Sequence, residues 1–363
     1  MIEFITTTAL EYCDDVRDGT HDSPKHLDNG YILITSKNIK DSEIDYNNAS
    51  YISEQDYNKI NERSLVEVND ILYSMIGTVG LVHRVSQKPN YAIKNMGLFK
   101  ISDEIRSKWL YYYLQSNEAK NEVNSRLSGS TQKFISLSNL RNMNVKYPKD
   151  KNDMKKTIKV LDSINNKIMI NNQINNNLHE LIRSMYDELV SNADWDEVEL
   201  SQVASVSSGK RPTTKNETDE YPIIGANGIM AYTNEFNMNS DLIITGRVGT
   251  LGVVKRYYKP IWASDNTLIV NTKYLNYIEC YLKTIDYNLL NRGSTQPLLT
   301  QGDLNKQTLL FSENEVLEFE SKVIPIVNKI RFNEDQNEIL SQLRDTLLPK
   351  LMNGEIDLDS IEI

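Results

Sequence analysis

A chain of 363 residues is long enough to form two domains of ordinary size. Its 39% hydrophobic and 25% charged residues are typical of a folded globular protein and exclude a disordered or fibrous one. The net charge of −10 excludes a protein with a basic coat over its whole surface, but not one with local basic loops that contact phosphates.

The N-terminal segment has no basic region followed by an apolar stretch, and no later apolar run reaches bilayer length. We therefore expect a cytoplasmic protein without membrane contact. Cys13 and Cys280 are far apart in the chain and lack the paired spacing of zinc ligands. We expect both to be ordinary thiols and expect no metal site.

Short sequence blocks recur in the same order in the two halves of the chain, which predicts a duplicated unit. Residues 31–39 resemble residues 221–229, and each block is an apolar run that ends in a polar, turn-prone segment. This pattern predicts a strand followed by a loop. Residues 70–82 match residues 241–254, and each block predicts a strand, a tight glycine turn and a second strand.

The third block, residues 127–135 and 291–299, contains Gly-Ser-Thr-Gln in both copies. Its match continues without a gap to Leu140 in the first half and Leu304 in the second. The hydroxyl and amide groups of this block suit polar recognition, and its glycine lets the main chain approach a partner closely. A structural turn is the alternative.

The fourth block predicts two long helices, one from residue 151 to about residue 192 and one over residues 312–354. Their seam residues follow alternating steps of three and four, and asparagines take the same two seam positions in each helix. The first seam is Leu161, Ile164, Ile168, Asn171, Asn175, Leu178, Ile182, Met185 and Leu189. The second seam is Val323, Ile326, Ile330, Asn333, Asn337, Leu340, Arg344, Leu347 and Leu351.

The ends of these helices are marked by capping and stop signals. We expect Asn152 or Asp153 to cap the first helix and Gly354 to end the second. Pro325 is expected to kink the second helix or to break it near its start. The two helices should pack on each other, or else each should pack only on its own domain. The seam asparagines either fix the register of the pair or occupy solvated positions without a role.

The order and duplication of these blocks resemble the specificity (S) subunits of type I restriction-modification systems over essentially the whole chain. Residues 19–24, 208–213 and 343–355 are also similar to segments of that family. The resemblance implies an α/β (α+β) fold with two target-recognition domains, separated by two long helices that form an antiparallel coiled coil. The implied boundaries are 1–150 and 194–311 for the domains, 151–193 and 312–354 for the helices, and 355–363 for a tail.

The resemblance also implies a function. Each domain would read one half of a bipartite double-stranded DNA target, and the chain itself would have no catalytic centre and bind no cofactor. Modification (M) subunits would carry S-adenosylmethionine, and restriction (R) subunits would use ATP and Mg. A helix of about forty residues spans roughly 60 Å, which is enough to set two readers on successive grooves about one DNA turn apart.

Candidate DNA contacts are residues on predicted loops that offer cations, amides or hydroxyls. In the first domain they are Thr20, His21, Lys25, Lys37, Asn38, Ser130, Thr131, Gln132 and Lys133. In the second domain they are Lys210, Arg211, Thr213, Asn227, Arg247, Ser294, Thr295 and Gln296. The loop of Lys210 and Arg211 is either a phosphate clamp or a solvated loop, and His21 is either a donor to DNA or a local structural partner. Because Gly-Ser-Thr-Gln occurs in both domains, a phosphate-positioning or structural role is favoured over base reading.

The competing class is an enzyme with its own recognition domain. Residues 246–252 are rich in glycine but match neither a phosphate-binding loop nor a dinucleotide fingerprint, and an amino-methyltransferase motif is absent from the sequence. Two Glu-x-Lys segments, at 118–120 and 320–322, have a nuclease-like spacing, but both lie in helical patterns, so chance explains them better. A third class is a scaffold that binds protein, which would not require paired basic and amide-bearing loops.

Overall fold

The protein is described by a computed structural model that covers residues 2–40, 43–129 and 132–356. The chain divides into two compact units. Unit 1 consists of the residues up to Met169 and those from Gln336 onward, and unit 2 consists of Ile170–Asp335. Each long helix contributes one segment to each unit, because α6 spans Lys151–Ser191 and α10 spans Glu313–Met352.

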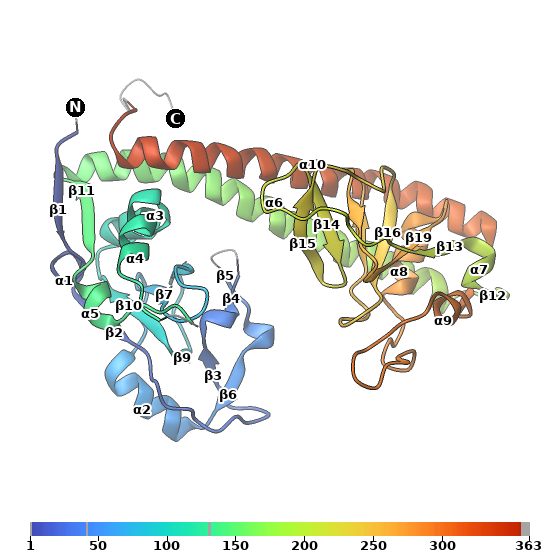
Figure 1. The fold of residues 1–363 in the computed structure, drawn as a ribbon, viewed down its shortest axis with the longest axis horizontal. Coiled ribbons are helices and arrows are strands. Elements are labelled where there is room, and N and C mark those ends of the chain that lie inside the picture. Colours follow the sequence, from blue (N-terminus) through green and yellow to red (C-terminus); the bar gives the residue numbers. More distant parts are fainter. Residues whose placement is uncertain (1, 41–42, 130–131, 357–363) are drawn as a thin grey trace. The chain divides into compact units, whose positions relative to one another are not determined.

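Unit 1 contains short strands arranged in small sheets (Figure 1). Its four-stranded sheet has the order β2-β10-β7-β8, and its three-stranded sheet has the order β6-β3-β9. Two strand pairs, β1-β11 and β4-β5, complete the unit. The bounds are β1 Phe4–Thr8, β2 Asp15–Asp18, β3 Tyr31–Ile34, β4 Ile39–Lys40, β5 Glu43–Ile44, β6 Ser50–Ile52, β7 Ile71–Ser74, β8 Val82–Arg84, β9 Tyr91–Ile93, β10 Met96–Lys100 and β11 Asn144–Pro148.

Among the described residues, unit 2 repeats this arrangement except for the β4-β5 pair. Its four-stranded sheet has the order β13-β19-β16-β17, its three-stranded sheet has the order β15-β14-β18, and β12 pairs with β20. In both three-stranded sheets the central strand has one antiparallel and one parallel neighbour. The bounds are β12 Glu197–Glu199, β13 Ser205–Ser208, β14 Tyr221–Gly225, β15 Gly228–Thr233, β16 Leu242–Gly246, β17 Lys255–Tyr257, β18 Trp262–Ala263, β19 Thr267–Asn271 and β20 Thr308–Leu310. The predicted duplication and the mixed α/β class are confirmed.

Short helices cover the sheets of each unit. Asp103 caps α3 by accepting a hydrogen bond from the main-chain N–H of Arg106, and Thr300 caps α9 in the same way through Asp303. Unit 1 is the larger recognition unit for two reasons. The segment between β3 and β6 contains β4 and β5, whereas only residues 226–227 join β14 to β15. The segment between β6 and β7 contains α2, whereas the described residues between β15 and β16 contain no helix. The helix bounds are α1 Ala9–Tyr12, α2 Glu54–Ser64, α3 Glu104–Gln115, α4 Asn117–Ser125, α5 Leu137–Arg141, α7 Leu200–Val203, α8 Leu275–Leu282 and α9 Gln301–Asn305.

The ends of the long helices differ in part from the sequence-based predictions. Asp150, and neither Asn152 nor Asp153, caps α6, because its carboxylate accepts a hydrogen bond from the main-chain N–H of Asn152 at 2.8 Å. Pro325 does not break α10, which continues through it. Buried neighbours such as Val323 and Ile330 hold this part of the helix in place despite the missing donor. Gly354 ends α10 with a left-handed backbone (φ +69°), as predicted.

The segments of α6 and α10 pack against each other in unit 2. Asn333 donates a hydrogen bond to the side chain of Asn175 at 2.7 Å, and Asn175 donates to the main-chain oxygen of Ile330. The rings of Tyr186 and Phe319 meet with their centroids 6.4 Å apart, so the two segments run antiparallel. The predicted packing of the two long helices on each other is therefore confirmed in unit 2, and the role of the seam asparagines in fixing the register stays a prediction.

In unit 1 the helices also meet each other and pack on the domain. Leu161 of α6 lies in one core cluster with Leu348 and Leu351 of α10, together with Trp109 of α3. Every predicted seam residue is shielded from solvent. Leu161, Ile164, Asn171, Asn175, Ile182, Val323, Ile330, Asn333 and Leu351 are buried, and Ile168, Leu178, Met185, Leu189, Ile326, Asn337, Leu340, Arg344 and Leu347 are half-buried. Each long helix therefore packs both on the other long helix and on the domains, the two arrangements that the sequence left as alternatives.

Candidate nucleic-acid interface

Three loops of each unit meet at one edge of the four-stranded sheet. In unit 1, β2 ends at Asp18 opposite Gly97, and β7 ends at Ser74 opposite Met96. The loops that leave these two strands therefore start at the same end of the sheet, one on each side of β10. We name the loop after β2 or β13 the entrance loop (residues 19–25 and 209–215) and the loop after β7 or β16 the hairpin loop (75–81 and 247–254). The segment that contains Gly-Ser-Thr-Gln is the tip loop (128–134 and 292–298).

The entrance loops of both units are anchored by the same main-chain contacts. Thr20 donates its main-chain N–H to the oxygen of Ile93 at 3.1 Å, and Lys210 donates to Ala263 at 2.9 Å. Each of these residues follows a glycine, Gly19 or Gly209, that lies in close contact with the main chain of the neighbouring strand segment. A Cβ at Gly209 would lie 2.1 Å from the main-chain oxygen of Ser264, so only glycine fits there.

The hairpin loop and the tip loop are joined by main-chain hydrogen bonds that recur in both units. In unit 1, Gly77 donates to Lys133 and Ile135 donates to Met75. In unit 2, Gly249 donates to Pro297 at 2.9 Å and Leu299 donates to Arg247 at 2.8 Å. The predicted tight glycine turn is therefore wrong. The two strands are linked by a longer loop, whose glycines allow a second loop to dock on it.

The joined loops leave the polar side chains of the tip loop in solvent. Gln132 and Lys133 are exposed in unit 1, and Ser294, Thr295 and Gln296 are exposed in unit 2. Ser130 and Thr131 lie outside the described residues. The main chain of the repeated block thus has the structural role that the sequence left open. Its side chains remain free to contact a ligand, and their contact with DNA stays a prediction.

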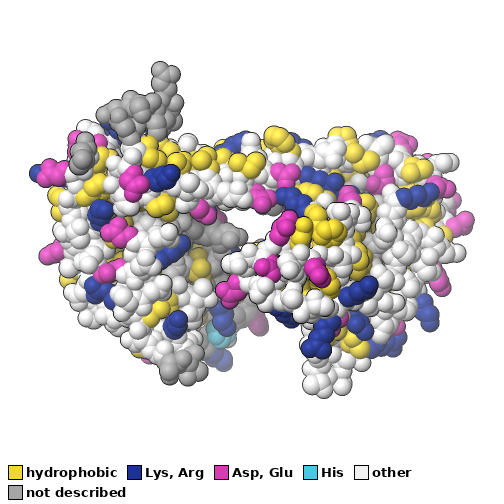
Figure 2. Space-filling model, turned by 45° about the horizontal axis from the view of Figure 1, so that its top comes forward, with side chains coloured by type: hydrophobic (Ala, Val, Ile, Leu, Met, Phe, Trp, Pro, Cys, Tyr) yellow, Lys and Arg dark blue, Asp and Glu magenta, His cyan; other side chains and the backbone are white. Residues whose placement is uncertain are grey.

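The entrance loop of unit 2 presents cations to solvent. Lys210, Arg211 and Thr213 are exposed, and within the described residues neither Lys210 nor Arg211 forms an ion pair. Figure 2 shows Lys and Arg side chains gathered on one side of unit 2. Asn227, in the turn after β14, is also exposed and lies near the same edge, because Ala226 is close to Gly246 at the end of β16.

Arg247 starts the hairpin loop of unit 2 and is half-buried. Its guanidinium donates to the main-chain oxygen of Asp265 at 3.1 Å, and its own main-chain N–H donates to Asn266. These contacts hold the guanidinium at the sheet edge, beside the anchored entrance loop. Arg247 is thus placed with the other candidate contacts of unit 2.

The candidates of unit 1 are less uniform. The two ring nitrogens of His21 lie 2.9 Å from the side-chain oxygens of Asn95 and Asp18, so the histidine is a local structural partner. These hydrogen bonds, from Asn95 first and Asp18 second, raise the pKa of His21. Lys25 and Lys37 are exposed, and Thr20 is half-buried with its hydroxyl accepting from the N–H of Asp22.

Asn38 is not available to DNA, which corrects the sequence-based prediction. Its side chain is buried, with 4% exposed. Its amide oxygen accepts hydrogen bonds from the main chain and the hydroxyl of Thr35, and its amide nitrogen donates to the main-chain oxygen of Asn48 at 3.1 Å. A buried amide satisfied in this way stabilises the loop between β3 and β6 and cannot reach a base edge.

Sequence reasoning missed the side chains that support the basic loop of unit 2. The indole N–H of Trp262 donates to the main-chain oxygen of Lys210 at 2.8 Å, and Trp262 itself is buried. Gln301 donates to the hydroxyl of Ser208 at 2.7 Å. No motif marks these residues, since each contacts a segment far away in sequence, Trp262 through the main chain of Lys210 and Gln301 through the hydroxyl of Ser208. Arg292, directly before the repeated tip-loop block, was also overlooked and could have been found by its position.

We expect Trp262→Phe to weaken DNA binding about threefold to fivefold while the unit stays folded. Phenylalanine keeps most of the buried ring but cannot donate to Lys210, so the basic loop loses one hydrogen bond that holds its conformation. The measurement is fluorescence anisotropy of a labelled duplex, with the thermal midpoint as a check on folding. Unchanged affinity would show that Trp262 does not position the loop.

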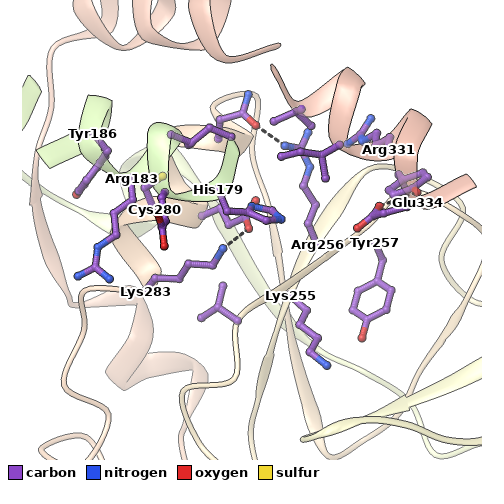
Figure 3. Close-up of a pocket in the computed structure, with 18 of the residues that line it drawn as sticks. His179, Arg183, Tyr186, Lys255, Arg256, Tyr257, Cys280, Lys283, Arg331 and Glu334 are labelled. Atoms are coloured by element: carbon purple, nitrogen blue, oxygen red, sulfur yellow. Dashed lines mark hydrogen bonds and ion pairs between the residues drawn. The ribbon is translucent and has the colours of Figure 1, made fainter. Parts of the chain in front are cut away.

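A cavity of about 670 Å³ lies in unit 2 between α6, α8, β17 and α10 (Figure 3). Its cations largely pair within the protein. Arg256 donates twice to the carboxylate of Asp241, both at 2.6 Å, and Arg331 donates to the same carboxylate. Lys283 pairs with Glu279. These pairs make the lining a structural ion network, in contrast to the unpaired cations of the entrance loop.

The Asp241 network gives a pH-dependent prediction. Burial favours a higher pKa for Asp241, but the hydrogen bonds from Arg256 and Arg331 outweigh it and hold the pKa below the usual range. Its contribution to stability is therefore present above the usual carboxyl range and is lost as the pH falls through the folded-state pKa. Asp241→Asn should lower the free energy of unfolding by about 2 kcal/mol at pH 7, with a smaller difference near pH 3.

Urea denaturation of the full chain at both pH values measures this effect. Glu318→Gln is the matched control, because Glu318 pairs with Lys322 on the exposed face of α10. Such surface pairs contribute under about 1 kcal/mol. An equal loss for both variants would show that the arginines do not depend on Asp241.

The residues with nuclease-like spacing have other roles. The carboxylate of Glu320 is buried and accepts hydrogen bonds from the side chain of Asn276 and the main-chain N–H of Tyr277. Within the described part of the chain, no group of three or more His, Cys, Asp or Glu side chains could hold a metal ion. Both cysteines are free thiols, and burial raises the pKa of Cys280 to about 12. Among the described residues, no helix is both long and apolar enough to span a bilayer.

The sequences of both units match one known protein family. The family model described as the type I restriction modification DNA specificity domain matches residues 25–180 and residues 192–311. The chain belongs to the type I restriction-modification specificity family. The resemblance that the sequence indicated is thereby confirmed, and each matched segment contains the hairpin loop and the tip loop of one unit.

Relatives within the specificity family are similar over much of this chain. The type I restriction enzyme MjaIX specificity subunit of Methanocaldococcus jannaschii is 23% identical, over 86% of this chain and 84% of its own length. The type I restriction enzyme HindI specificity subunit of Haemophilus influenzae is 24% identical over 45% of this chain and 42% of its own. The crystal structure of the S subunit of a type I system from M. genitalium shares the fold, with a TM-score of 0.57, 17% identity and 96% coverage of both chains.

Proposed function

We propose that this chain is the specificity subunit that reads a bipartite double-stranded DNA target, one half with each unit. The observation that carries the proposal is the recurrence of entrance, hairpin and tip loops at one sheet edge in both units, with different exposed side chains. Two units that share the same loop arrangement but differ in their exposed side chains are suited to recognise different half-sites. The chain directs partner methyltransferase and restriction subunits to that target in the cytoplasm and has no catalytic activity of its own.

The chemistry of the loops supports this role. Gln132 and Gln296 each offer an exposed amide that can donate a hydrogen bond to a phosphate oxygen. Lys37 and Asn227 differ between the units and offer donors that can pair with base edges in the major groove. Lys210 and Arg211 offer cations for phosphates, and the glycines of the hairpin loops let the DNA backbone come close. Base-reading and phosphate-holding groups thus lie on adjacent loops of one surface.

The catalytic cofactors belong to the partner subunits in this proposal: S-adenosylmethionine with the M subunits, and ATP with Mg on the R subunits. The glycine-rich residues 246–252 support the assignment. A phosphate-binding loop would open a helix, whereas this segment leads from β16 to β17 and docks the tip loop.

An apolar stripe on α10 supports the docking of partner subunits. In unit 2, Leu317, Ile324 and Phe332 are exposed by 46%, 49% and 57% and are seven and eight residues apart, so they share one face of the helix. Exposed apolar side chains aligned along a helix are typical of a surface that another helix covers. The stripe is distinct from the seam residues, which are shielded.

The proposal is tested by mapping methylated sites in cells that express Lys37→Ala or Asn227→Ala in place of the natural chain. Both residues are exposed candidate contacts, and they differ between the units. Each variant should relax sequence preference in one half of the methylated motif and leave the other half unchanged. Loss of one bidentate contact to a base costs about 1–3 kcal/mol of discrimination at its base pair.

Cells without the chain serve as the control and should lose methylation of the motif entirely. Methylation of the full motif without the chain would contradict the proposed function. If both variants relaxed the same half of the motif, the assignment of one half-site to each unit would be wrong.

A further inference from the structure

The two units differ in charge at positions that the fold makes equivalent. Shared main-chain contacts define these positions, so the comparison does not depend on sequence similarity. The main-chain N–H groups of Lys210 and Thr20 donate to equivalent strand residues, Ala263 in unit 2 and Ile93 in unit 1. Arg211 and His21 are the next residues in the chain. Arg247 and Met75 each accept the hydrogen bond that joins the tip loop to the hairpin loop.

A fourth position shows the same difference. Arg292 donates its main-chain N–H to Leu298 across the tip loop of unit 2, and Ser128 donates to Phe134 across the tip loop of unit 1. At all four equivalent positions unit 2 has a lysine or arginine, and unit 1 has none. Met75 is buried and His21 has both ring nitrogens engaged, so these two residues of unit 1 do not substitute for the missing cations.

The remaining charges of the loops do not cancel this difference. The three loops of unit 2 contain five cations and no acidic residue, whereas those of unit 1 contain Lys25, Lys133 and the acidic Asp22. Arg292 is paired with Asp303 but keeps 67% of its side chain exposed.

The acidic residues that follow the entrance loop of unit 2 lie away from the sheet edge. Asn216 pairs with Tyr232, beside the start of β14, whereas Lys210 is anchored at Ala263, beside its end. Tyr232 is paired with Pro222 and Ala263 with Ile224, so two residues of β14 separate these points by about 7 Å. Among the described residues, the carboxylates of residues 217–220 form no ion pair with Lys210 or Arg211.

We propose that unit 2 supplies most of the phosphate contacts that hold DNA, and that unit 1 adds sequence reading with little electrostatic affinity. This inference rests on the proposed DNA-reading function and assigns its electrostatic part to one unit. Exposed cations release counterions from the DNA when they contact its phosphates. Each such contact makes the slope of log affinity against log salt concentration steeper by about one unit. Binding to DNA of any sequence should thus begin at unit 2.

The experiment measures the affinity of the full chain, copurified with its partner subunits, for a 40-bp duplex of mixed sequence at several salt concentrations. Such a duplex reports phosphate contacts and does not require knowledge of the target. Two variants each remove two exposed cations, Lys210→Ala with Arg211→Ala in unit 2 and Lys25→Ala with Lys133→Ala in unit 1. Their thermal midpoints should equal that of the natural chain.

The unit 2 variant should lose roughly tenfold in affinity and about two units of salt slope, and the unit 1 variant should lose less than threefold and under one unit. Equal losses, or a larger loss for the unit 1 variant, would overturn the inference while leaving the proposed DNA binding intact. Failure of the natural complex to bind the duplex at any salt concentration would instead contradict the DNA-binding function itself.

Discussion

Ile330→Asp should destabilise the helix pair of unit 2 by about 4 kcal/mol or more. Ile330 is 4% exposed and belongs to the core cluster that joins α6, α8 and α10. An aspartate there loses the buried apolar surface and places a carboxylate against the apolar side chains of this cluster. Because this loss is a large fraction of the stability of an ordinary domain, much of unit 2 should be unfolded. Circular dichroism of the full chain during urea denaturation measures the change.

Ile324→Asp is the matched control, since it places the same substitution in the same helix and the same unit. Ile324 is 49% exposed, so the variant should change the free energy of unfolding by under about 1 kcal/mol. Under the proposed function it should instead reduce copurification of the partner subunits. If both variants unfolded equally, the seam and the exposed stripe would not be distinct surfaces.

Gly293→Ala should lower DNA affinity at least tenfold without unfolding unit 2. A Cβ at position 293 would lie 1.7 Å from the main-chain oxygen of Gln296, so the tip loop must open. Opening moves Gln296 and weakens the hydrogen bond from Gly249 to Pro297 that docks the tip loop on the hairpin loop. Fluorescence anisotropy with a labelled duplex measures the affinity, and the thermal midpoint reports folding.

The control for this variant is Gly302→Ala in α9. The nearest atom to a Cβ there is the hydroxyl of Thr300 at 3.9 Å, and alanine favours a helix more than glycine. We expect unchanged DNA affinity and slightly higher stability. Natural affinity of Gly293→Ala would remove the tip loop of unit 2 from the DNA interface.

The long helices could be predicted closely from the sequence because their signals are local. The steps of three and four along each seam depend only on residues within one helix, and α6 and α10 begin and end within two residues of the predicted bounds. Asp150 was missed as the cap because Asn152 and Asp153 are equally suitable by residue type. The continuity of α10 through Pro325 depends on packing against distant residues, which the local sequence does not contain.

The candidate interface could be predicted only in part for the same reason. The repeated blocks identified the loops, but the strand pairings that bring them to one edge depend on contacts between distant segments. Asn38 was assigned to DNA by residue type and position after a strand, and its burial follows from the loop that closes over it. The support of Lys210 by Trp262 joins two positions 52 residues apart, and no spacing rule links them.

The main-chain bonds between the hairpin and tip loops have a consequence for the evolution of this protein. Main-chain donors and acceptors are the same for nearly every amino acid, so the bonds from Gly249 to Pro297 and from Leu299 to Arg247 survive most changes of the side chains around them. Under the proposed function, new target preferences can therefore arise by substitution of these side chains while the loop framework persists. The duplicated framework would then let the preference for each half-site change independently of the other.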